Sequence, residues 1–461
     1  MLIDFRVENY RSFANEQSLS MIASQRIGSD EHPNHRMSLA GSESELLRAA
    51  VIWGANGAGK SNLFKAMKFA VETILEGTEP KAGVPYDPFV FHEEFRSSLS
   101  AFAFRFFVDG EIYEYGFTIS SSGIEEEWLS VRVGKKDQLL FERMPDLNGV
   151  PEVQLGRKIT QKEFPRIRAL SAVGTRKNQL FLTSIRENIA ASEYGTYFSS
   201  VLSWFEEHLV FIGPSDRYGL MSELIGSDET FAKFAGQFLH RAGTGVHRLR
   251  VQSKDVDIAA LKAQVGSDRF ETLLSSLGEG ETHVISTPDD DIDLVIENRG
   301  GPSAKMRRIE ADHGIEGSTL LLSEESDGTR RLLNLLPALH LLSHGSRVFI
   351  IDELDRSLHP NLSVEFLKFF LNACEGDCRQ LIVTTHEDRL LDLDILRRDE
   401  IWFVEKIESG ASELRSLAEF KVRKDLKIDK GYLNGRFGGV PKFGHLQDLL
   451  PEADLARLAK A

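Results

Sequence analysis

The stretch with the clearest chemistry in this sequence runs from Gly54 through Ala55, Asn56, Gly57, Ala58, Gly59 and Lys60 to Ser61. It matches the Walker A pattern G-x-x-x-x-G-K-[ST] at every defined position. Glycines let consecutive backbone N–H groups converge on a phosphate, and the positive end of a following helix faces the same anion. Lys60 can reach the β- and γ-phosphates, and the Ser61 hydroxyl can coordinate Mg²⁺. The stretch therefore predicts binding of ATP with Mg²⁺.

The flanking residues predict the elements that would position this loop. The preceding residues end in the apolar, β-prone Ala50, Val51, Ile52 and Trp53, which predict a strand. Asn62–Glu76 predicts a helix, with Asn62 in its first turn and counted among the nucleotide contacts. The alternative is a glycine-rich turn that matches by chance. The strand–loop–helix setting disfavours it, because that setting is what the motif requires.

A second buried strand carries two carboxylates at its end. Val348 to Ile351 is a continuous apolar run followed by Asp352 and Glu353. Such runs are typical of strands in parallel sheets, whose carboxyl ends gather ligands. We interpret it as a Walker B strand, in which Asp352 holds Mg²⁺ and Glu353 orients and polarises the attacking water. A core strand that ends in surface acids is the alternative, and the complete Walker A motif upstream argues against it.

Two further segments complete the expected site. Gln380–Thr385 predicts another buried strand, after which His386 would contact the γ-phosphate or the attacking water. Upstream, Ser326 and Gly328 open a helix expected over Arg330–Ser343. Serine and glycine at a helix start form an anion site, so this end predicts a second phosphate contact. Taken alone, Ser326 would be interpreted as a simple N-cap.

Together these segments resemble an ABC-type ATPase, with signature, Walker B, D-loop (Leu354 and Asp355) and switch histidine in that family's order. Ser326 precedes Asp352 by 26 residues, which leaves room for one helix and a turn. Lys60 precedes Asp352 by 292 residues, so a large insertion lies between them, as in the SMC-like branch but globular. The signature is Ser-Asp-Gly-Thr rather than Ser-Gly-Gly-Gln. No Q-loop glutamine is recognisable, and His92 or a neighbour is the candidate for that place.

A narrower resemblance covers the whole chain. The segments ESDGTRRL (Glu325–Leu332), IIDELDRSLHP (Ile350–Pro360), TTHEDRLLD (Thr384–Asp392), RRDEIWFVEK (Arg397–Lys406) and YLNGRFGGVP (Tyr432–Pro441) resemble the AAA15/OLD-like ATPases, including the RloA type and the ATPase subunit of the PARIS system. The strand that ends in NYRSF (Asn9–Phe13) also fits. The resemblance implies an ATPase of bacterial anti-phage defence whose ATP-sandwich homodimer, or a higher homo-oligomer, works beside a separate Toprim-type nuclease or other toxin.

The expected fold class is an α/β P-loop NTPase with an ABC/SMC-like head, a mixed sheet with flanking helices and a large inserted α+β, mainly helical, globular subdomain. The strands expected before the insertion are Met1–Phe13, Gln17–Ala23, Ala101–Val108, Ile112–Ser120 and Glu127–Val133. Helices are expected over Ser184–Leu209, Ser222–Leu239 and Ile258–Leu277. The predicted domain segments are 1–135 and 286–420 for the two ATPase halves, 136–285 for the insertion and 421–461 for a basic tail.

Several remaining features favour ordinary structural interpretations. Ser24–Glu45 predicts an exposed loop, Asp289–Asp293 a solvated turn rather than a metal site, and Cys374 with Cys378 a buried pair. Asp392 and Asp394 match D-x-D but do not follow an apolar strand, so no Toprim domain is expected. The tail Lys421–Arg436 carries six basic residues and two acids, and we favour a solvated surface over a contact with DNA.

The net charge of −15 excludes a globally basic nucleic-acid coat, and the sequence offers no apolar run of ~18 residues that would predict a membrane span. A cytoplasmic protein is expected. The sequence therefore predicts an ATP-driven sensor and scaffold that controls an effector in phage defence. The alternative is a RecF-like DNA-repair ATPase that acts directly on DNA, which would require DNA as its partner.

Overall fold

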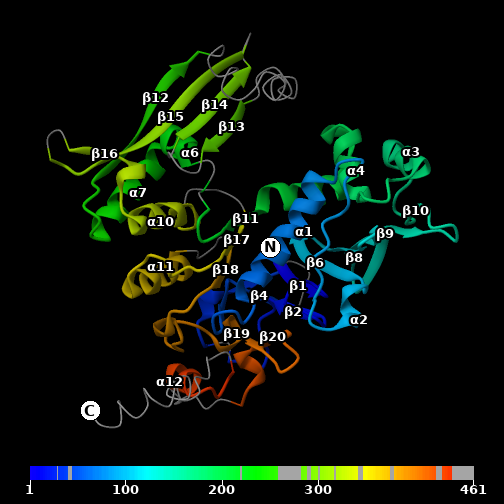
Figure 1. Cartoon of the computed structure of the whole chain (residues 1–461), viewed down its shortest axis with the longest axis horizontal. Helices are drawn as coiled ribbons and strands as arrows, with labels where there is room; N and C mark the ends of the chain where they lie inside the picture. Colours follow the sequence, from blue (N-terminus) through cyan, green and yellow to red (C-terminus); the bar gives the residue numbers. More distant parts are fainter. Residues whose placement is uncertain are drawn as a thin grey trace, which may run out of the picture. The chain divides into compact units, whose positions relative to one another are not determined.

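The computed structural model describes residues 1–28, 30–39, 44–216, 218, 221–257, 282–287, 292–298, 302–315, 318–340, 346–373, 378–421 and 428–438 (Figure 1). The chain divides into two compact units. The first unit is Met1–Glu206 with Thr384–Ala461, and the second is Glu207–Val383. The segment boundary expected after residue 285 falls within strand β13 (Thr282–Thr287).

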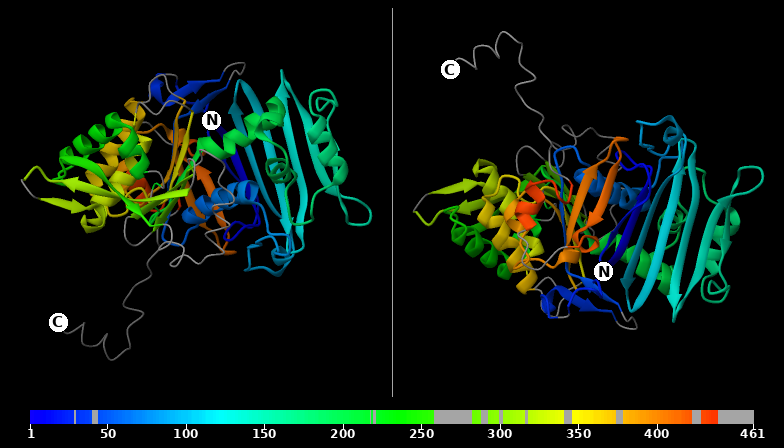
Figure 2. Two further views of the ribbon diagram at one scale, coloured as in Figure 1. Left: turned by 90° about the horizontal axis from the view of Figure 1, so that it is seen from above. Right: turned by 90° about the horizontal axis from the view of Figure 1, so that it is seen from below.

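The first unit contains an antiparallel sheet with the strand order β10-β9-β8-β7-β6-β1-β2. Figure 2 shows its strands, blue to cyan, side by side. Asp109 and Gly110, both at positive φ, form the turn between β6 and β7 and set the pairing of Val108 with Glu111. The strands are β1 (Leu2–Glu8), β2 (Gln17–Ser20), β6 (Ser100–Val108), β7 (Glu111–Ser120), β8 (Gly123–Val133), β9 (Lys136–Pro145) and β10 (Pro151–Leu155). The strands expected over Ala101–Val108, Ile112–Ser120 and Glu127–Val133 are present as β6, β7 and β8, and the two expected N-terminal strands are present in shorter form as β1 and β2. The sequence did not predict the pairing of β1 with β6.

Helix α1 (Lys60–Glu76) packs on this sheet through aromatic rings. The ring of Phe69 on α1 lies 5.4 Å from that of Tyr10 and 5.3 Å from that of Phe102 on β6. At the other end of α1, the Thr183 hydroxyl donates to the carbonyl oxygen of Ile74 (2.8 Å). The remaining helices of the unit are α2 (Glu93–Arg96), α3 (Pro165–Val173), α4 (Phe181–Asn188), α5 (Gly195–Ser203) and α12 (Ile428–Leu433).

The Walker strand of the first unit, β5 (Ala49–Trp53), is buried along its whole length. It pairs in parallel with β19 (Ile401–Lys406), which pairs antiparallel with β20 (Ser412–Ser416). Burial on both sides explains the continuous apolar sequence of β5. A short hairpin of β3 (Arg36–Ser38) and β4 (Glu45–Leu47) precedes it.

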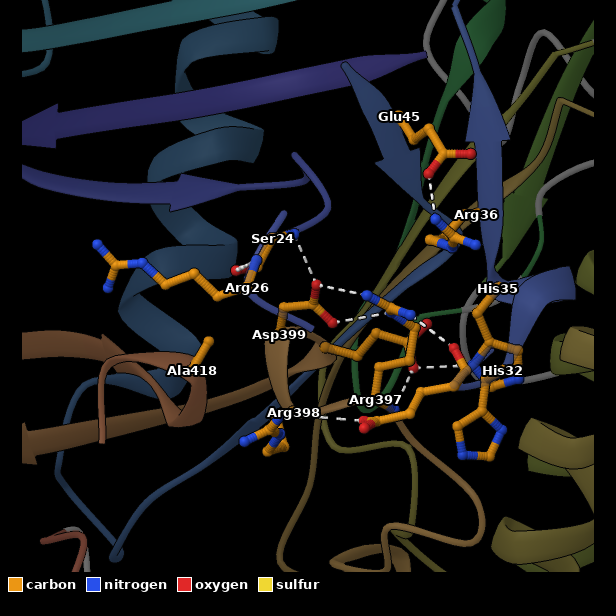
Figure 3. Close-up of polar contacts among 12 residues, drawn as sticks. Ser24, Arg26, His32, His35, Arg36, Glu45, Arg397, Arg398, Asp399 and Ala418 are labelled. Carbon is orange, nitrogen blue, oxygen red and sulfur yellow. Dashed lines mark hydrogen bonds and ion pairs between the residues drawn. The ribbon is translucent and has the colours of Figure 1, made fainter. Parts of the chain in front are cut away.

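A buried ionic cluster holds the turn before β19 to the N-terminal segment (Figure 3). Arg397 donates to both carboxylate oxygens of Asp399 (3.0 Å each), and Asp399 also accepts from the backbone N–H of Ser24 (2.7 Å). Glu400 accepts from the backbone N–H of Arg397 (2.8 Å) and lies 2.9 Å from Nδ1 of His35. Ser24–Glu45 is therefore not simply an exposed loop, since His35 is buried in this cluster.

The second unit contains three parallel strands, with β17 (Val348–Ile351) paired to both β11 (Leu209–Ile212) and β18 (Gln380–Thr384). Its antiparallel sheet has the order β12-β15-β14-β13, with β16 beside β15. The strands of this sheet are β12 (Arg248–Val256), β13 (Thr282–Thr287), β14 (Ile292–Asn298), β15 (Pro302–Asp312) and β16 (Thr319–Leu321). The α-helices among the described residues of the unit are α6 (Met221–Ser227), α7 (Glu229–Arg241), α10 (Asp327–Leu335) and α11 (Pro360–Ala373).

Several expectations for this region need correction. The helix expected over Ser184–Leu209 ends earlier, because Leu209 begins β11. Asp293 lies within β14 rather than in a turn before it, while residues 289–291 and the helix expected at Ile258–Leu277 lie outside the described residues. Cys378 is exposed, so the expected buried cysteine pair is wrong for that residue, and Cys374 lies outside the described residues. None of the helices in the described part is long and apolar enough to cross a membrane.

Candidate functional site

The Walker A loop lies in the first unit between β5 and α1. Gly57 (φ 76°) and Gly59 (φ 119°) have positive φ, a conformation that residues with a side chain rarely adopt. A Cβ atom on Gly54 would lie 2.5 Å from the carbonyl oxygen of Val404 on β19. The loop therefore needs glycine at Gly57 and Gly59 for its turn and at Gly54 for close packing. Helix α1 begins at Lys60 directly after the turn, two residues before the expected start at Asn62, and it ends at Glu76 as expected.

Lys60 is buried and folds back over the loop, where Nζ donates to the carbonyl oxygens of Gly54 (2.6 Å) and Ala55 (3.3 Å). Ser61 and Asn62 occupy the first turn of α1. The side-chain amide of Asn62 donates to Oγ of Ser12 (2.9 Å). Lys60 Nζ therefore lies against the Walker A loop itself, the segment that the motif assigns to phosphate binding.

Two serines that the sequence pattern does not single out hold this loop. The Ser412 hydroxyl donates to the carbonyl oxygen of Ala58, and a Cβ on Gly59 would lie 2.3 Å from Ser412 Oγ and 2.8 Å from Ser12 Oγ. Ser12 follows two residues with positive φ, Asn9 (47°) and Arg11 (52°), in a tight turn. Ser12 belongs to the NYRSF segment (Asn9–Phe13) that resembles the AAA15/OLD-like ATPases, whereas no local sequence pattern around Ser412 indicates its contact with the loop.

His386 lies beside the end of the Walker A strand within the first unit. The backbone N–H of Thr385 donates to the carbonyl oxygen of Ile52 (3.0 Å), and Nε1 of Trp53 donates to that of Glu387 (3.0 Å). These two bonds fix the residues on either side of His386, whose side chain is exposed. The first unit thus brings together Gly54, Ala55, Asn56, Gly57, Ala58, Gly59, Lys60, Ser61, Asn62 and His386.

The second unit carries the Walker B residues. All of β17 is buried, and Asp352 directly after it is 2% exposed. The backbone N–H of Asp352 donates to the carbonyl oxygen of Ile212 at the end of β11 (3.0 Å). Glu353 is half-buried and has a left-handed backbone (φ 52°), which is rare for a residue with a side chain. Such strained conformations concentrate at functional sites, which fits a role for the Glu353 carboxylate.

The signature segment opens α10 in the same unit. The Ser326 hydroxyl accepts from the backbone N–H of Thr329 (3.2 Å) and lies 2.9 Å from the Thr329 hydroxyl. Ser326 is therefore the N-cap of this helix, which begins three residues earlier than expected and ends at Leu335. A Cβ on Gly328 would lie 2.8 Å from the carbonyl oxygen of Ser357 in the D-loop segment. The second unit thus brings together Ser326, Gly328, Asp352 and Glu353.

An arginine that the sequence pattern did not single out joins these residues. Arg331 on α10 is 5% exposed, and its guanidinium donates to the carbonyl oxygens of Gly213 (2.7 Å), Asp352 (2.9 Å) and Glu353 (2.9 Å). Burial lowers the pKa of Arg331 from 12.5 to about 10. The guanidinium stays charged at neutral pH and holds the ends of β11 and β17 to the signature helix.

The family comparison decides the identity of the fold. A model described as "AAA domain, putative AbiEii toxin, Type IV TA system" matches residues 49–229 and 259–392, which is more than half of the chain. The chain belongs to this AAA-domain family. The matched ranges contain Gly54–Asn62, Ser326, Gly328, Asp352, Glu353 and His386, and the family and the described elements identify a P-loop NTPase with an ABC/SMC-like head.

Other comparisons add little to the AAA-domain assignment. An SMC head domain from Thermotoga maritima is 13% identical, with 90% of this chain and 98% of that chain covered and a TM-score of 0.38. An SMC head domain from Pyrococcus furiosus, bound to the C-terminal domain of ScpA, is 13% identical, with 94% and 98% covered and a TM-score of 0.36. No curated protein matches the chain.

Proposed function

We propose that this chain binds and hydrolyses ATP as a dimeric switch and controls a separate effector in anti-phage defence. The observation that carries the ATPase part is the Walker A loop of an AAA-domain chain, with buried Lys60 folded over its carbonyl groups. The family description, which names a putative toxin of a type IV system, and the resemblance to AAA15/OLD-like ATPases support the defence role. The effector would be a Toprim-type nuclease or another toxin.

In this proposal each residue has one task. The N–H groups of Gly54–Ser61 and Asn62 surround the phosphates, and Lys60 balances the charge on the β- and γ-phosphates. Hydroxyl and carboxylate oxygens are the ligands that Mg²⁺ prefers, so Ser61 and Asp352 fit the ion directly or through water. The bound ion would neutralise charge on the phosphate oxygens. Glu353 orients the attacking water and accepts its proton, and His386 contacts the γ-phosphate.

The homodimer completes the site in this proposal. Ser326 and Gly328 of one protomer face the nucleotide held by the partner subunit's Lys60, so that two ATP molecules are enclosed between two copies. ATP binding then closes the dimer and hydrolysis reopens it, because the closed dimer makes contacts with ATP that the open dimer does not make. The helix N-cap at Ser326 supports this role, since such an end presents N–H groups to an anion.

Substitution of the two key residues tests the ATPase part. Glu353→Gln should retain ATP binding but lose ~10²–10⁴-fold in hydrolysis rate, the usual effect of removing a general base. Lys60→Ala should lose binding. Glu365→Gln, on the exposed face of α11, is the matched control and should hydrolyse ATP at the wild-type rate. Wild-type turnover in Glu353→Gln would refute its assignment as the base.

The defence role is tested by plating phage on cells that express the chain with and without its adjacent genes. Protection that requires both a neighbouring gene product and Lys60 would support control of a separate effector. A RecF-like repair ATPase should instead be strongly stimulated by DNA, and its DNA affinity should fall steeply with salt. That result, without protection against phage, would favour the alternative.

A further inference from the structure

Arg331 forms a fixed link between the signature helix and the Walker B turn of the second unit. Its three hydrogen bonds reach the ends of two neighbouring parallel strands, β11 through Gly213 and β17 through Asp352 and Glu353. A planar guanidinium with several N–H groups can make these contacts at once, whereas a lysine ammonium cannot reproduce the same fork. The contact is therefore specific to arginine at this position.

The same helix carries the signature residues. Ser326 is the N-cap of α10, and Arg331 lies within the following turns of this nine-residue helix. Because helical backbone is stiff over such a short span, a displacement of the N-cap moves Arg331 with it. Gly328 adds a second contact, since its backbone approaches the carbonyl oxygen of Ser357 too closely for any side chain. Helix α10 and the segment 352–357 are therefore joined at two points.

Arg331 also acts on the residue that is expected to direct the water. The left-handed backbone of Glu353 (φ 52°) is unfavourable for a residue with a side chain. The hydrogen bond from Arg331 to the Glu353 carbonyl oxygen helps to hold that conformation (2.9 Å). Arg356 Nη1 lies 3.9 Å from Oε2 of the Glu353 carboxylate. The direction of this carboxylate thus depends on the position of α10.

We propose that Arg331 is a positioning residue that couples the nucleotide contacted by Ser326 to the hydrolysis directed by Glu353 of the same chain. This inference rests on the proposed ATP-sandwich dimer. In that dimer Ser326 serves the nucleotide of the partner subunit, whereas Glu353 serves the nucleotide of its own Lys60. Arg331 therefore links the two ATP sites, and hydrolysis is cooperative in ATP.

The substitution Arg331→Lys tests this coupling. We expect the affinity for a non-hydrolysable ATP analogue to change less than about twofold, because the Walker A loop does not contain Arg331. We expect kcat to fall by ~10²-fold, the typical cost of misplacing a catalytic group. The Hill coefficient for ATP should fall from above 1 to about 1. Arg331→Gln, which buries no ammonium group, is the second variant if the lysine variant does not fold.

Arg379→Lys is the matched control. Arg379 is another buried arginine of the second unit, and it donates to the carbonyl oxygens of Ala338 (3.4 Å) and His340 (2.8 Å). It should keep the wild-type kcat and Hill coefficient. Equal losses in both arginine variants would show a general structural effect and overturn the inference, as would wild-type values in Arg331→Lys.

Mixed dimers separate the loss of Glu353 positioning from damage to the signature. In a dimer of one Lys60→Ala protomer and one protomer with intact Lys60, only the site of the intact protomer is active. Arg331→Lys should lower the rate when placed in the intact protomer, whose Glu353 acts, and much less when placed in the Lys60→Ala protomer. Equal effects in both placements would overturn the inference. Absence of ATP hydrolysis in the wild-type protein would instead refute the proposed function itself.

Discussion

Glu400 is a carboxyl group without exposed surface, held by His35 and by the backbone N–H of Arg397. Burial raises its pKa above the ordinary value of 4.5, although the hydrogen bond from His35 opposes this shift. The folded protein thus holds the Glu400 proton more tightly than the unfolded chain does. The contribution of this group to stability is complete below pH 4.5 and is lost as the pH rises through its folded pKa.

The variant Glu400→Gln removes this titration. We expect its free energy of unfolding to decline less between pH 4.5 and neutrality than that of the wild-type protein. Denaturant unfolding at a series of pH values measures the difference. Glu142→Gln, at a partly exposed position on β9, is a control that should keep the wild-type pH dependence. Parallel pH profiles for Glu400→Gln and the wild type would show that Glu400 does not titrate in this range.

Some site residues could be identified from the sequence and others could not. The two groups differ in the number of residues along the chain that separate each one from its contact partner. The Walker residues share short patterns, so the type and order of residues near Lys60 and Asp352 were sufficient to locate them. Ser412 bonds to a residue 354 positions away, and His35 to one 365 positions away. No local pattern encodes such pairs. Arg331 belongs to the segment ESDGTRRL (Glu325–Leu332), but its buried contacts depend on the tertiary placement of β11 and β17.

Among the secondary-structure elements, those with strong local signals were predicted well. The Asp-Gly turn and alternating aromatic residues located β6 and β7, and the apolar runs located β5 and β17. Strand β11 was missed because its four residues follow directly after the π-helical turn Trp204–His208, which continues helix α5. A short buried strand cannot be distinguished from a helix end by periodicity alone. Its pairing partner, β17, lies more than one hundred residues further along.

Gly54, directly after β5, lies so close to β19 that an added methyl group at this position should disturb the structure. In Gly54→Ala the new Cβ would lie 2.5 Å from the Val404 carbonyl oxygen, so the strand end or the loop must move. We expect a loss of ~1–3 kcal/mol in stability, as for other overpacked sites, together with weaker ATP binding. Thermal or denaturant unfolding and nucleotide titration measure the two effects.

Gly83→Ala is the matched control for this prediction. No heavy atom lies within 4 Å of the Cβ position at Gly83, and its backbone does not require glycine. It should leave both stability and ATP binding within experimental error of the wild type. Unchanged stability in Gly54→Ala would show that β5 and β19 separate more easily than their backbone contact indicates.

At the scale of the whole molecule, the proposed function requires two copies of the chain. The two sets of site residues lie in different compact units, Lys60 in the first and Glu353 and Ser326 in the second. In the proposed ATP sandwich, one nucleotide contacts residues of both protomers. Its binding energy therefore favours the dimer, whereas hydrolysis removes the γ-phosphate contacts that hold the copies together.

The variant Glu353→Gln should accumulate as a closed dimer in ATP and Mg²⁺, because it retains nucleotide contacts but cannot complete hydrolysis. Analytical ultracentrifugation with and without ATP measures the shift in mass. The double variant Glu353→Gln/Lys60→Ala should show no ATP-dependent shift, since it lacks the phosphate contact. Glu353→Gln/Ser326→Ala should still bind ATP but dimerise less, because it loses the N-cap that faces the partner's nucleotide. An ATP-dependent shift of equal size in all three variants would exclude the sandwich as the cause of dimerisation.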